Sequence, residues 1–462
     1  MPTQPSHDDA TSSSPDPRSL TRFILRGGAL GVGARLVVVL GGFAVQVILA
    51  RILPPKELGA YFLIQSVVST VAVFSQMGLD RPLTRDLARF TGRGEDARAR
   101  GLLLLGLRMS FIPVVGISAI YALGGGAWLG KTLFSSPTVA GASMAGAAWL
   151  AGSAFQNLGS SAIRGFHSVG AAAFLGGALT NVVVVATLSA LLLAGRGAEF
   201  ISIVWIAASA TWLNVVLCSL FLAKRVRGVS TEPGTSARTL LRVALPLIGA
   251  QVAGIAFTHA DLWVLGALLP EDDVALYGAA KRVALLIGVP LSALAMVVLP
   301  IIADLHSRGE SQRLERLLRG SATLAGIPAL LVALPCLVLS DSILALIFGP
   351  FFAGGGMLLK LFCIQQIAVV FVGPCVAVLS MTGHERDVFV IVVVGGVLSI
   401  IAIYLGGHLG GSLGIAIAFT VAGVLREGAS LWFVRRRLGI RTDVDFLHLR
   451  PMQEAAKRAL GR

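Results

Sequence analysis

The stretch Ala244–Asp304 reads ALPLIGAQVAGIAFTHADLWVLGALLPEDDVALYGAAKRVALLIGVPLSALAMVVLPIIAD. An acidic turn at residues 271–273 divides it into two apolar segments, each long enough to cross the roughly 30 Å hydrocarbon core of a bilayer. Ionisable side chains in hydrocarbon are costly, so they usually face a bundle interior or a water-filled cavity. We therefore expect a bundle of membrane helices that encloses the ionisable residues of this stretch, His259, Asp261, Lys281 and Arg282.

The composition places the whole chain among membrane proteins. Of its 462 residues, 55% are hydrophobic and only 13% are charged, and the mean hydropathy is +0.82. Apolar runs of about 20 residues recur, and backbone groups in lipid must be satisfied within each run, which predicts α-helices. The alternating pattern of a membrane barrel is absent. This composition excludes a soluble globular fold, and no loop is long enough to form a further domain.

We predict an all-α polytopic membrane protein whose twelve transmembrane helices form two six-helix lobes around a central cavity. The first apolar run is too long for a signal-peptide core, so we expect it to be retained as the first helix. The expected organisation is a disordered cytoplasmic tail (1–20), an N-terminal lobe (21–226), a cytoplasmic linker (227–241), a C-terminal lobe (242–436) and a basic cytoplasmic tail (437–462). The expected helices cover residues 27–50, 58–79, 102–123, 138–157, 171–194, 201–223, 243–268, 275–303, 321–340, 356–379, 389–405 and 412–434.

The basic residues predict the orientation of this bundle. The N-terminal tail and every second loop after it carry 28 Lys and Arg residues, whereas the opposite loops carry only 4. Because Lys and Arg accumulate in cytoplasmic loops, we predict that both termini are cytoplasmic. The same bias explains the formal net charge of +14, and no motif points to nucleic acid as a partner.

The two halves of the chain resemble each other where a predicted helix ends. Leu53 and Pro54 precede Tyr61, and Leu269 and Pro270 precede Tyr277, at a constant offset of 216 residues. Both helices run in the same direction, which predicts a parallel repeat about an axis along the membrane normal. Prolines concentrate inside the helices of the second half, which favours bending of those helices during transport.

Several charges inside the predicted helices have two interpretations. Asp261 could form a structural ion pair with Lys281 or Arg282 on the next helix, or it could serve ion coupling. His259 lies two residues before Asp261 and therefore on another helix face, as a hydrogen-bonded packing residue or as a proton carrier.

The remaining intramembrane charges lie nearer the cytoplasmic ends of their helices. Arg108 could snorkel to the surface, and Arg426 and Glu427 could form a local pair. Arg35 is flanked by apolar residues and glycine, so it is expected to face the cavity. The buried set is net positive, which favours a multiply anionic solute such as a diphosphate, because the guanidinium fork matches oxyanions.

Three segments of the chain resemble the polysaccharide repeat-unit flippases of the MOP superfamily. The first is LARILPPKELGAYFLIQSVVSTVAVFSQMGLDRPLTRDLARF (Leu49–Phe90), which is similar to the amino-terminal signature of that family. The second is FQNLGSSAIRGFHSVGAAAFLG (Phe155–Gly176), and the third lies within Ala244–Ala284. The resemblance covers residues from about 20 to 440.

This resemblance implies a function and a site. It implies alternating-access transport of undecaprenyl-diphosphate-linked oligosaccharides from the inner to the outer leaflet of a bacterial cytoplasmic (inner) membrane. Polysaccharide polymerase or export proteins are the implied partners, and we expect a functional monomer. The expected substrate cavity comprises Arg35, Arg81, Arg108, Lys281, Arg282 and Arg426, and the expected coupling or structural-pair residues are Asp261, His259 and Glu427.

Two other functions are open to a chain of this kind. An ion-coupled multidrug or small-molecule antiporter of the same superfamily would use acidic residues in the first lobe. The predicted helices of that lobe, however, hold no clearly intramembrane Asp or Glu, and Asp80 lies at the inner end of the second helix. An integral-membrane glycan enzyme would need a catalytic surface on sizeable outer loops, and the outer loops here are short. We therefore predict a transporter, not an enzyme, with no metal, no cofactor and no nucleotide-binding loop.

Overall fold

A computed structural model describes residues 17–195 and 197–444 of the chain, and within them every regular element is helical. Short π-helical and 3-10 segments join some of the α-helices. The α-helices are α1 (Pro17–Ile52), α2 (Pro55–Ser75), α3 (Asp80–Gly92), α4 (Asp96–Ile120), α5 (Gly126–Trp128), α6 (Pro137–Gly141), α7 (Ser143–Gly165), α8 (Val169–Ala173), α9 (Leu179–Leu193), α10 (Phe200–Arg225), α11 (Ala237–Leu268), α12 (Glu271–Leu285), α13 (Val289–Ser307), α14 (Ser311–Val338), α15 (Ser340–Phe348), α16 (Gly356–Val372), α17 (Cys375–Met381) and α18 (Glu385–Leu438).

The all-helical membrane fold is confirmed. Each of the twelve ranges predicted from the sequence falls on helix, with ends that differ by several residues. Among the described residues, eight helical stretches are long and apolar enough to cross a bilayer. The chain is therefore a multi-pass membrane protein. Its longest helix, α18, bends at Gly410 and Gly411, where φ is −144° and 57°, and so forms two antiparallel arms.

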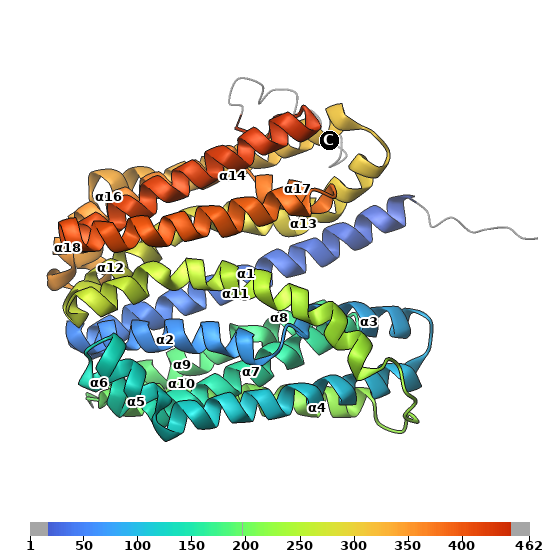
Figure 1. The fold of residues 1–462 in the computed structure, drawn as a ribbon, viewed down its shortest axis with the longest axis horizontal. Helices are drawn as coiled ribbons and strands as arrows, with labels where there is room; N and C mark the ends of the chain where they lie inside the picture. Colours follow the sequence, from blue (N-terminus) through green and yellow to red (C-terminus); the bar gives the residue numbers. More distant parts are fainter. Residues whose placement is uncertain (1–16, 196, 445–462) are drawn as a thin grey trace, which may run out of the picture.

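The helices form two lobes with α1 and α11 between them (Figure 1). Helices α2 to α10 pack on one another as the N lobe, and α12 to α18 pack as the C lobe. Helix α1 contacts α9 and α13, and α11 contacts α2 and α18, so both helices touch both lobes. We call the end of the bundle where α1 begins and α18 ends the terminal end. The opposite end, where α2 and α12 begin, is the turn end.

The repeat seen in the sequence has a structural counterpart in the way α2 and α12 begin. Pro54 and Pro270 precede the two helices with nearly the same backbone angles, φ −62° with ψ 154° and φ −62° with ψ 158°. Proline is well suited to a helix start, because its missing N–H would have no partner there anyway. The two helices also pack on each other across the boundary between the lobes.

Several predicted long helices are interrupted, and the residues explain where. The segment 275–303 is divided by a 3-10 turn at Leu286–Gly288, directly before Pro290. The segment 171–194 contains Gly177 at φ 148°, a conformation that favours glycine. The segment 356–379 breaks at Gly373, with φ 82°, and Pro374. The bending of these helices during transport stays a prediction.

Some boundaries differ from the sequence prediction. Helix α1 already includes residues 17–20, which we had assigned to the tail, while residues 1–16 lie outside the described part of the chain. The linker ends earlier than predicted, because α11 begins at Ala237. Residues 80–101, predicted as a loop, contain α3. That helix buries Leu83, Leu87 and Phe90 at helical spacing and leaves its polar face exposed.

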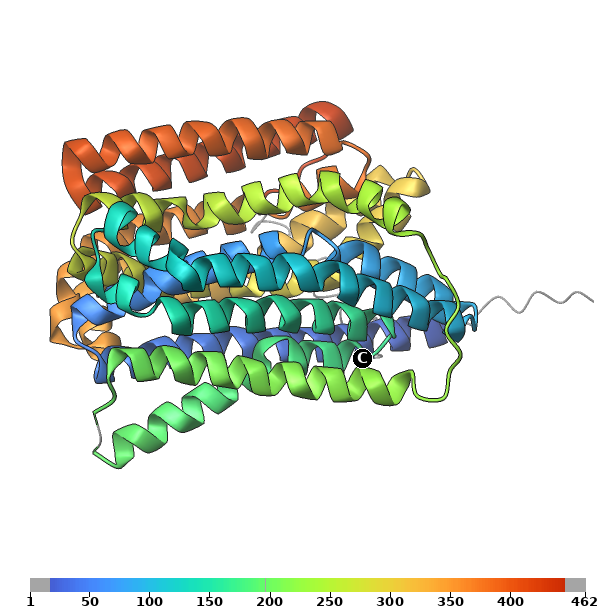
Figure 2. The same ribbon diagram turned by 60° about the horizontal axis from the view of Figure 1, so that its bottom comes forward.

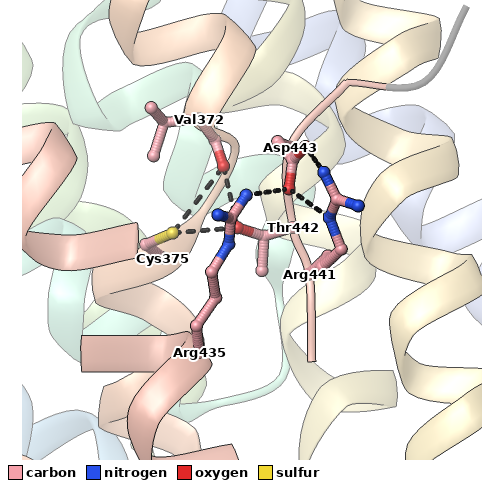
Figure 3. A network of polar contacts seen from close by, with 6 residues as sticks. All are labelled: Val372, Cys375, Arg435, Arg441, Thr442 and Asp443. Carbon is pink, nitrogen blue, oxygen red and sulfur yellow. Dashed lines mark hydrogen bonds and ion pairs between the residues drawn. The ribbon is translucent and has the colours of Figure 1, made fainter. Parts of the chain in front are cut away.

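The last described residues fold back onto the C lobe instead of forming part of a free tail (Figure 3). Helix α16 ends at Val372, whose carbonyl accepts a hydrogen bond of 2.9 Å from the hydroxyl of Thr442. Asp443 then pairs with Arg435 at 3.0 Å and with Arg441 at 3.2 Å. We call residues 439–444 the C-terminal strap. It provides a hydrogen bond to a carbonyl at a helix end, which the thiol of Cys375 also contacts at 3.6 Å.

Candidate functional site

Two ionisable residues of the stretch Ala244–Asp304, Asp261 and Lys281, form a buried cluster with Tyr277 between α11 and α12. Asp261 is fully buried, and its Oδ2 lies 2.6 Å from Nζ of Lys281. The same oxygen accepts a hydrogen bond of 2.8 Å from the hydroxyl of Tyr277. Lys281 also donates to the carbonyl of Thr258, at 2.9 Å. Asp261 therefore forms its direct ion pair with Lys281 and not with Arg282.

Arg282 points away from this pair and toward the N lobe. Its guanidinium donates to Oε1 of Gln65 on α2, at 2.9 Å, and lies 3.5 Å from the ring centroid of Phe62. A cation above an aromatic face is attracted by the negative face of the ring. Gly278 permits this approach, because a Cβ at that position would lie 2.3 Å from the ring of Phe62. Arg282 therefore connects the two lobes.

Two further residues of α11 contact α2 beside this connection. Nε2 of His259 lies 3.2 Å from the hydroxyl of Ser69, so His259 faces the N lobe while Asp261 faces the C lobe. The indole N–H of Trp263 donates to the hydroxyl of Ser66, at 3.0 Å. The different faces predicted for His259 and Asp261 agree with these contacts. In the structure His259 is a hydrogen-bonded packing residue.

The turn end of the interface is closed by Glu271, the first residue of α12. Its carboxylate accepts a hydrogen bond from the hydroxyl of Ser136 and lies 3.8 Å from Nζ of Lys56, both of which belong to the N lobe. Gly59 of α2 packs against the Glu271 carbonyl so closely that a Cβ would lie 1.9 Å from it. On another side, Arg51 donates to carbonyls of α15. The lobes are thus tightly joined at this end.

A polar cavity of about 560 Å³ lies toward the terminal end. Its walls come from α2, α3, α7 and α11, and it contains Arg81 and Arg164, both exposed. No salt bridge in the described part of the chain involves either arginine. Asp80 and Gln251 also line the cavity, and Nε2 of Gln251 lies 3.2 Å from each carboxylate oxygen of Asp80. We call this space, which lies between the N lobe and α11, the interlobe cavity; its other lining residues are Val73, Gln76, Asn157, Ser160, Ser161, Gly176, Gly254 and Thr258.

The structure does not bring the whole predicted set into one cavity. Arg81 lines the interlobe cavity, while Lys281 and Arg282 belong to the buried contacts described above. Arg108 is exposed on α4 and is not among the cavity residues. Arg426 lies 3.2 Å from Glu427, as the local pair interpretation predicts, and lines a separate groove within α18. The side chain of Arg35 lies outside the part that the structure describes.

Sequence reasoning missed several residues of the interface. Arg164 lies in a loop between predicted helices, and Gln65, Gln251 and Glu271 carry no signal of their own, because amides and loop carboxylates are common everywhere. A signal existed for Arg164, since it lies within the second segment that resembles the flippases. The amphipathic pattern of α3 could also have placed Arg81 on a helix beside the cavity.

Comparisons with known proteins agree on the fold and on a family. A family model described as "Polysaccharide biosynthesis protein" matches residues 24–306. The probable low-salt glycan biosynthesis flippase Agl15 of Haloferax volcanii is 26% identical over 219 residues, which span 46% of this chain and 46% of that protein.

Solved structures of two transporters share the fold. An inward-facing multidrug resistance MATE family transporter of the MOP superfamily superposes with a TM-score of 0.71 at 17% identity, covering 88% of this chain and 98% of that one. The lipid II flippase MurJ, in an inward closed conformation, superposes with a TM-score of 0.69 at 12% identity, covering 89% of this chain and 87% of that one. At these identities the likeness concerns the fold alone.

Proposed function

Because the chain belongs to the polysaccharide biosynthesis protein family, we propose that it is a flippase that moves lipid-linked oligosaccharides across a membrane. The proposed cargo is an oligosaccharide repeat unit on undecaprenyl diphosphate, moved from the inner to the outer leaflet of a bacterial cytoplasmic membrane. The product would be used in surface polysaccharide biosynthesis, with a polymerase or export protein acting next. Agl15, which shares about a quarter of its aligned residues with this chain, bears the name of a glycan flippase.

The observation that carries the proposal is the pair of arginines in the interlobe cavity. Arg81 and Arg164 have no ion-pair partner in the described part of the chain, and they share the cavity with hydroxyl and amide side chains and with Asp80, whose carboxylate is held by Gln251. Guanidinium groups suit phosphate oxyanions, whereas hydroxyls and amides suit sugar hydroxyls. A diphosphate joined to a sugar presents both kinds of group, so this lining fits such a headgroup better than it fits an organic cation.

The closed turn end supports an alternating-access mechanism. Glu271 and Arg282 join the lobes on that side, while the interlobe cavity lies toward the terminal end, which the distribution of basic residues predicts to be cytoplasmic. In the proposed cycle, the headgroup enters the cavity from the cytoplasm, the contacts at the turn end break, and the cavity then opens to the other side. A ligand drives such a change only when it binds the two states with different affinities.

Asp261 is the proposed coupling residue. It is fully buried inside a predicted membrane segment, and its second carboxylate oxygen, Oδ1, has no hydrogen-bond partner within the described part of the chain. Buried carboxylates at membrane depth mark proton or ion pathways in many transporters. Binding of a proton or cation there would weaken the pair with Lys281, which lies on the same helix as Arg282 and would therefore affect the interlobe contact.

The test is deletion of the gene followed by analysis of lipid-linked glycans. Loss of a surface glycan is expected, with complete repeat units accumulating on the cytoplasmic leaflet, where added glycosidases cannot reach them in intact cells. An unchanged glycan with increased drug sensitivity would instead establish the alternative, an ion-coupled multidrug antiporter of the same fold. Accumulation of incomplete units would place the protein before translocation and reject the flippase.

A further inference from the structure

A second cavity lies between the two arms of α18, apart from the interlobe cavity. It has a volume of about 400 Å³ and is lined by residues from 390–402 on the first arm and 418–433 on the second. Its lining is apolar except for Ser399 and Arg426. Figure 2 shows the two arms side by side along one edge of the molecule. We call this cavity the α18 groove.

Small residues keep the groove open along its length. At the bend, Gly406 and Gly414 bring the two arms into contact, since a Cβ on Gly406 would lie 2.5 Å from the Gly414 carbonyl oxygen. Away from the bend, the floor is made by small residues such as Gly395 and Ala422, while larger side chains such as Leu425, 67% exposed, form the rim. The arms therefore enclose a space instead of packing tightly on each other.

The shape of the groove favours a single hydrocarbon chain. Val390 and Ala402 stand 12 residues apart, a distance of about 18 Å along a helix. An α-helix with its side chains is about 10–12 Å wide, so a helix of that length would need far more space than the groove provides. A linear chain fits both the length and the small cross-section, and the aliphatic lining suits it.

Arg426 places a cationic group beside this apolar groove. Its side chain is 40% exposed, and one guanidinium nitrogen lies 3.2 Å from Oε1 of Glu427 on the same helix. Its Cγ lies against Gly395, where the missing side chain leaves room beside it. The guanidinium carries five N–H donors, so others remain for a phosphate.

We propose that the α18 groove first binds the polyprenyl chain of a lipid-linked substrate, with Arg426 donating hydrogen bonds to the phosphate that adjoins the chain before the headgroup enters the interlobe cavity. The inference rests on the proposed function and deepens it by assigning the lipid part of the substrate to its own site. A two-chain phospholipid fits less well, because the groove has room for one chain. The glycan headgroup and the lipid chain would then be recognised by different parts of the protein.

The experiment uses the full-length protein in nanodiscs and undecaprenyl phosphate that carries a photoreactive diazirine on its chain. After illumination, labelled peptides are identified by mass spectrometry. Labelling is expected on residues 390–433, and excess unlabelled undecaprenyl phosphate should compete with it, whereas phosphatidylglycerol should not. Ala422→Trp, which fills the groove, is expected to remove the labelling.

The N lobe provides a matched control. Helices α9 and α10 enclose a cavity of about 380 Å³ that holds no charged residue, and Ser209→Trp fills it. This control variant should label α18 like the wild type. Arg426→Gln should weaken competition by undecaprenyl phosphate roughly tenfold, since a charge-assisted hydrogen bond is lost. Arg426→Lys should keep part of the affinity.

Three outcomes would overturn the inference: equal competition by phosphatidylglycerol, labelling that Ala422→Trp leaves intact, or no labelling of α18. The readout is binding and does not depend on glycan transport. If the gene deletion leaves surface glycans unchanged while labelling behaves as expected, the proposed function fails and the groove remains a polyprenyl phosphate site. If the deletion blocks glycan export but α18 is not labelled, only the groove inference fails.

Discussion

Arg282 of the C lobe donates a hydrogen bond of 2.9 Å to Gln65 of the N lobe, and the two residues occupy nearly equivalent places in the repeat. At the offset of 216 residues, Gln65 corresponds to Lys281, the neighbour of Arg282. In the C lobe, Lys281 pairs with Asp261 of the preceding helix, whereas Gln65 receives a hydrogen bond of 3.3 Å from Gln46 of α1. One repeat thus holds an ion pair where the other holds two amides, and Arg282 connects the two.

Arg282→Gln should loosen the turn-end half of the interface. The variant loses a charge-assisted hydrogen bond to Gln65 and the contact with the ring of Phe62, whose contributions are about 1.5–3 and about 0.5–2 kcal/mol. Spin labels at Lys131 in the N lobe and Ser342 in the C lobe should report a longer and broader distance distribution. Arg282→Lys, which keeps the charge, should give an intermediate distribution. A distribution identical to the wild type in both variants would show that this connection does not hold the lobes.

Removing one member of the buried ion pair should destabilise the protein strongly. Asp261→Asn leaves the ammonium of Lys281 buried without its anion, a change that costs about 3–5 kcal/mol in comparable pairs. The expected result is a lower unfolding free energy in detergent, measured by chemical denaturation. The double variant Asp261→Asn with Lys281→Gln should recover much of the loss, because no uncompensated charge remains. Additive losses would contradict the pairing.

Glu271→Ala should favour opening at the turn end. The substitution removes the acceptor for Ser136 and the carboxylate that faces Lys56, so both contacts that the Glu271 side chain makes with the N lobe are lost. The same label pair should then show a larger fraction of long distances. Asp272→Ala is the matched control, because Asp272 follows directly in the sequence but is exposed, and its distances should equal those of the wild type. If both variants behave alike, Glu271 does not hold the lobes together.

Arg81→Gln and Arg164→Gln should each reduce export of the surface glycan in complementation of a gene deletion. Each variant removes one of the two cationic groups that the interlobe cavity offers to a diphosphate, and loss of a hydrogen bond to a charged group costs about 1.5–3 kcal/mol of binding. Arg89→Gln changes an exposed arginine of the same helix, α3, that does not line the cavity, and it should complement fully. Full complementation by the double variant Arg81→Gln with Arg164→Gln would disprove a role for the pair.

The sequence predicted the features that depend on composition and local pattern. Each apolar run of about 20 residues falls on helix, and the Pro54 and Pro270 motifs located the two equivalent helix starts, whereas the amphipathic helix α3 was not predicted. It could not predict which of the two cations pairs with Asp261. Lys281 and Arg282 are adjacent in sequence, but Lys281 contacts Asp261 whereas Arg282 contacts Gln65 of the N lobe. That choice depends on how α2 and α12 approach each other, which in turn depends on the absence of side chains at Gly59 and Gly278.

Asp443 makes docking of the C-terminal strap dependent on pH. Burial raises the pKa of this carboxyl, but hydrogen bonds donated by Arg435 and Arg441 outweigh burial and hold the pKa below its usual range. A carboxyl whose pKa is lower in the docked state stabilises docking above its undocked pKa. That stability is lost as pH falls through the docked pKa.

Hydrogen–deuterium exchange of the strap tests this pH dependence. The backbone N–H of Val444, which donates to the Phe371 carbonyl at 3.0 Å, should be protected at neutral pH. After correction for the intrinsic exchange rate, its protection should fall as the medium is acidified below the usual range of aspartate. Asp443→Asn should show the low protection already at neutral pH, whereas Arg436→Gln, which changes an exposed neighbour outside the network, should behave like the wild type. Protection that does not change with pH in the wild type would mean that the strap is held by its contacts with Val372, Cys375 and Phe371 and not by Asp443.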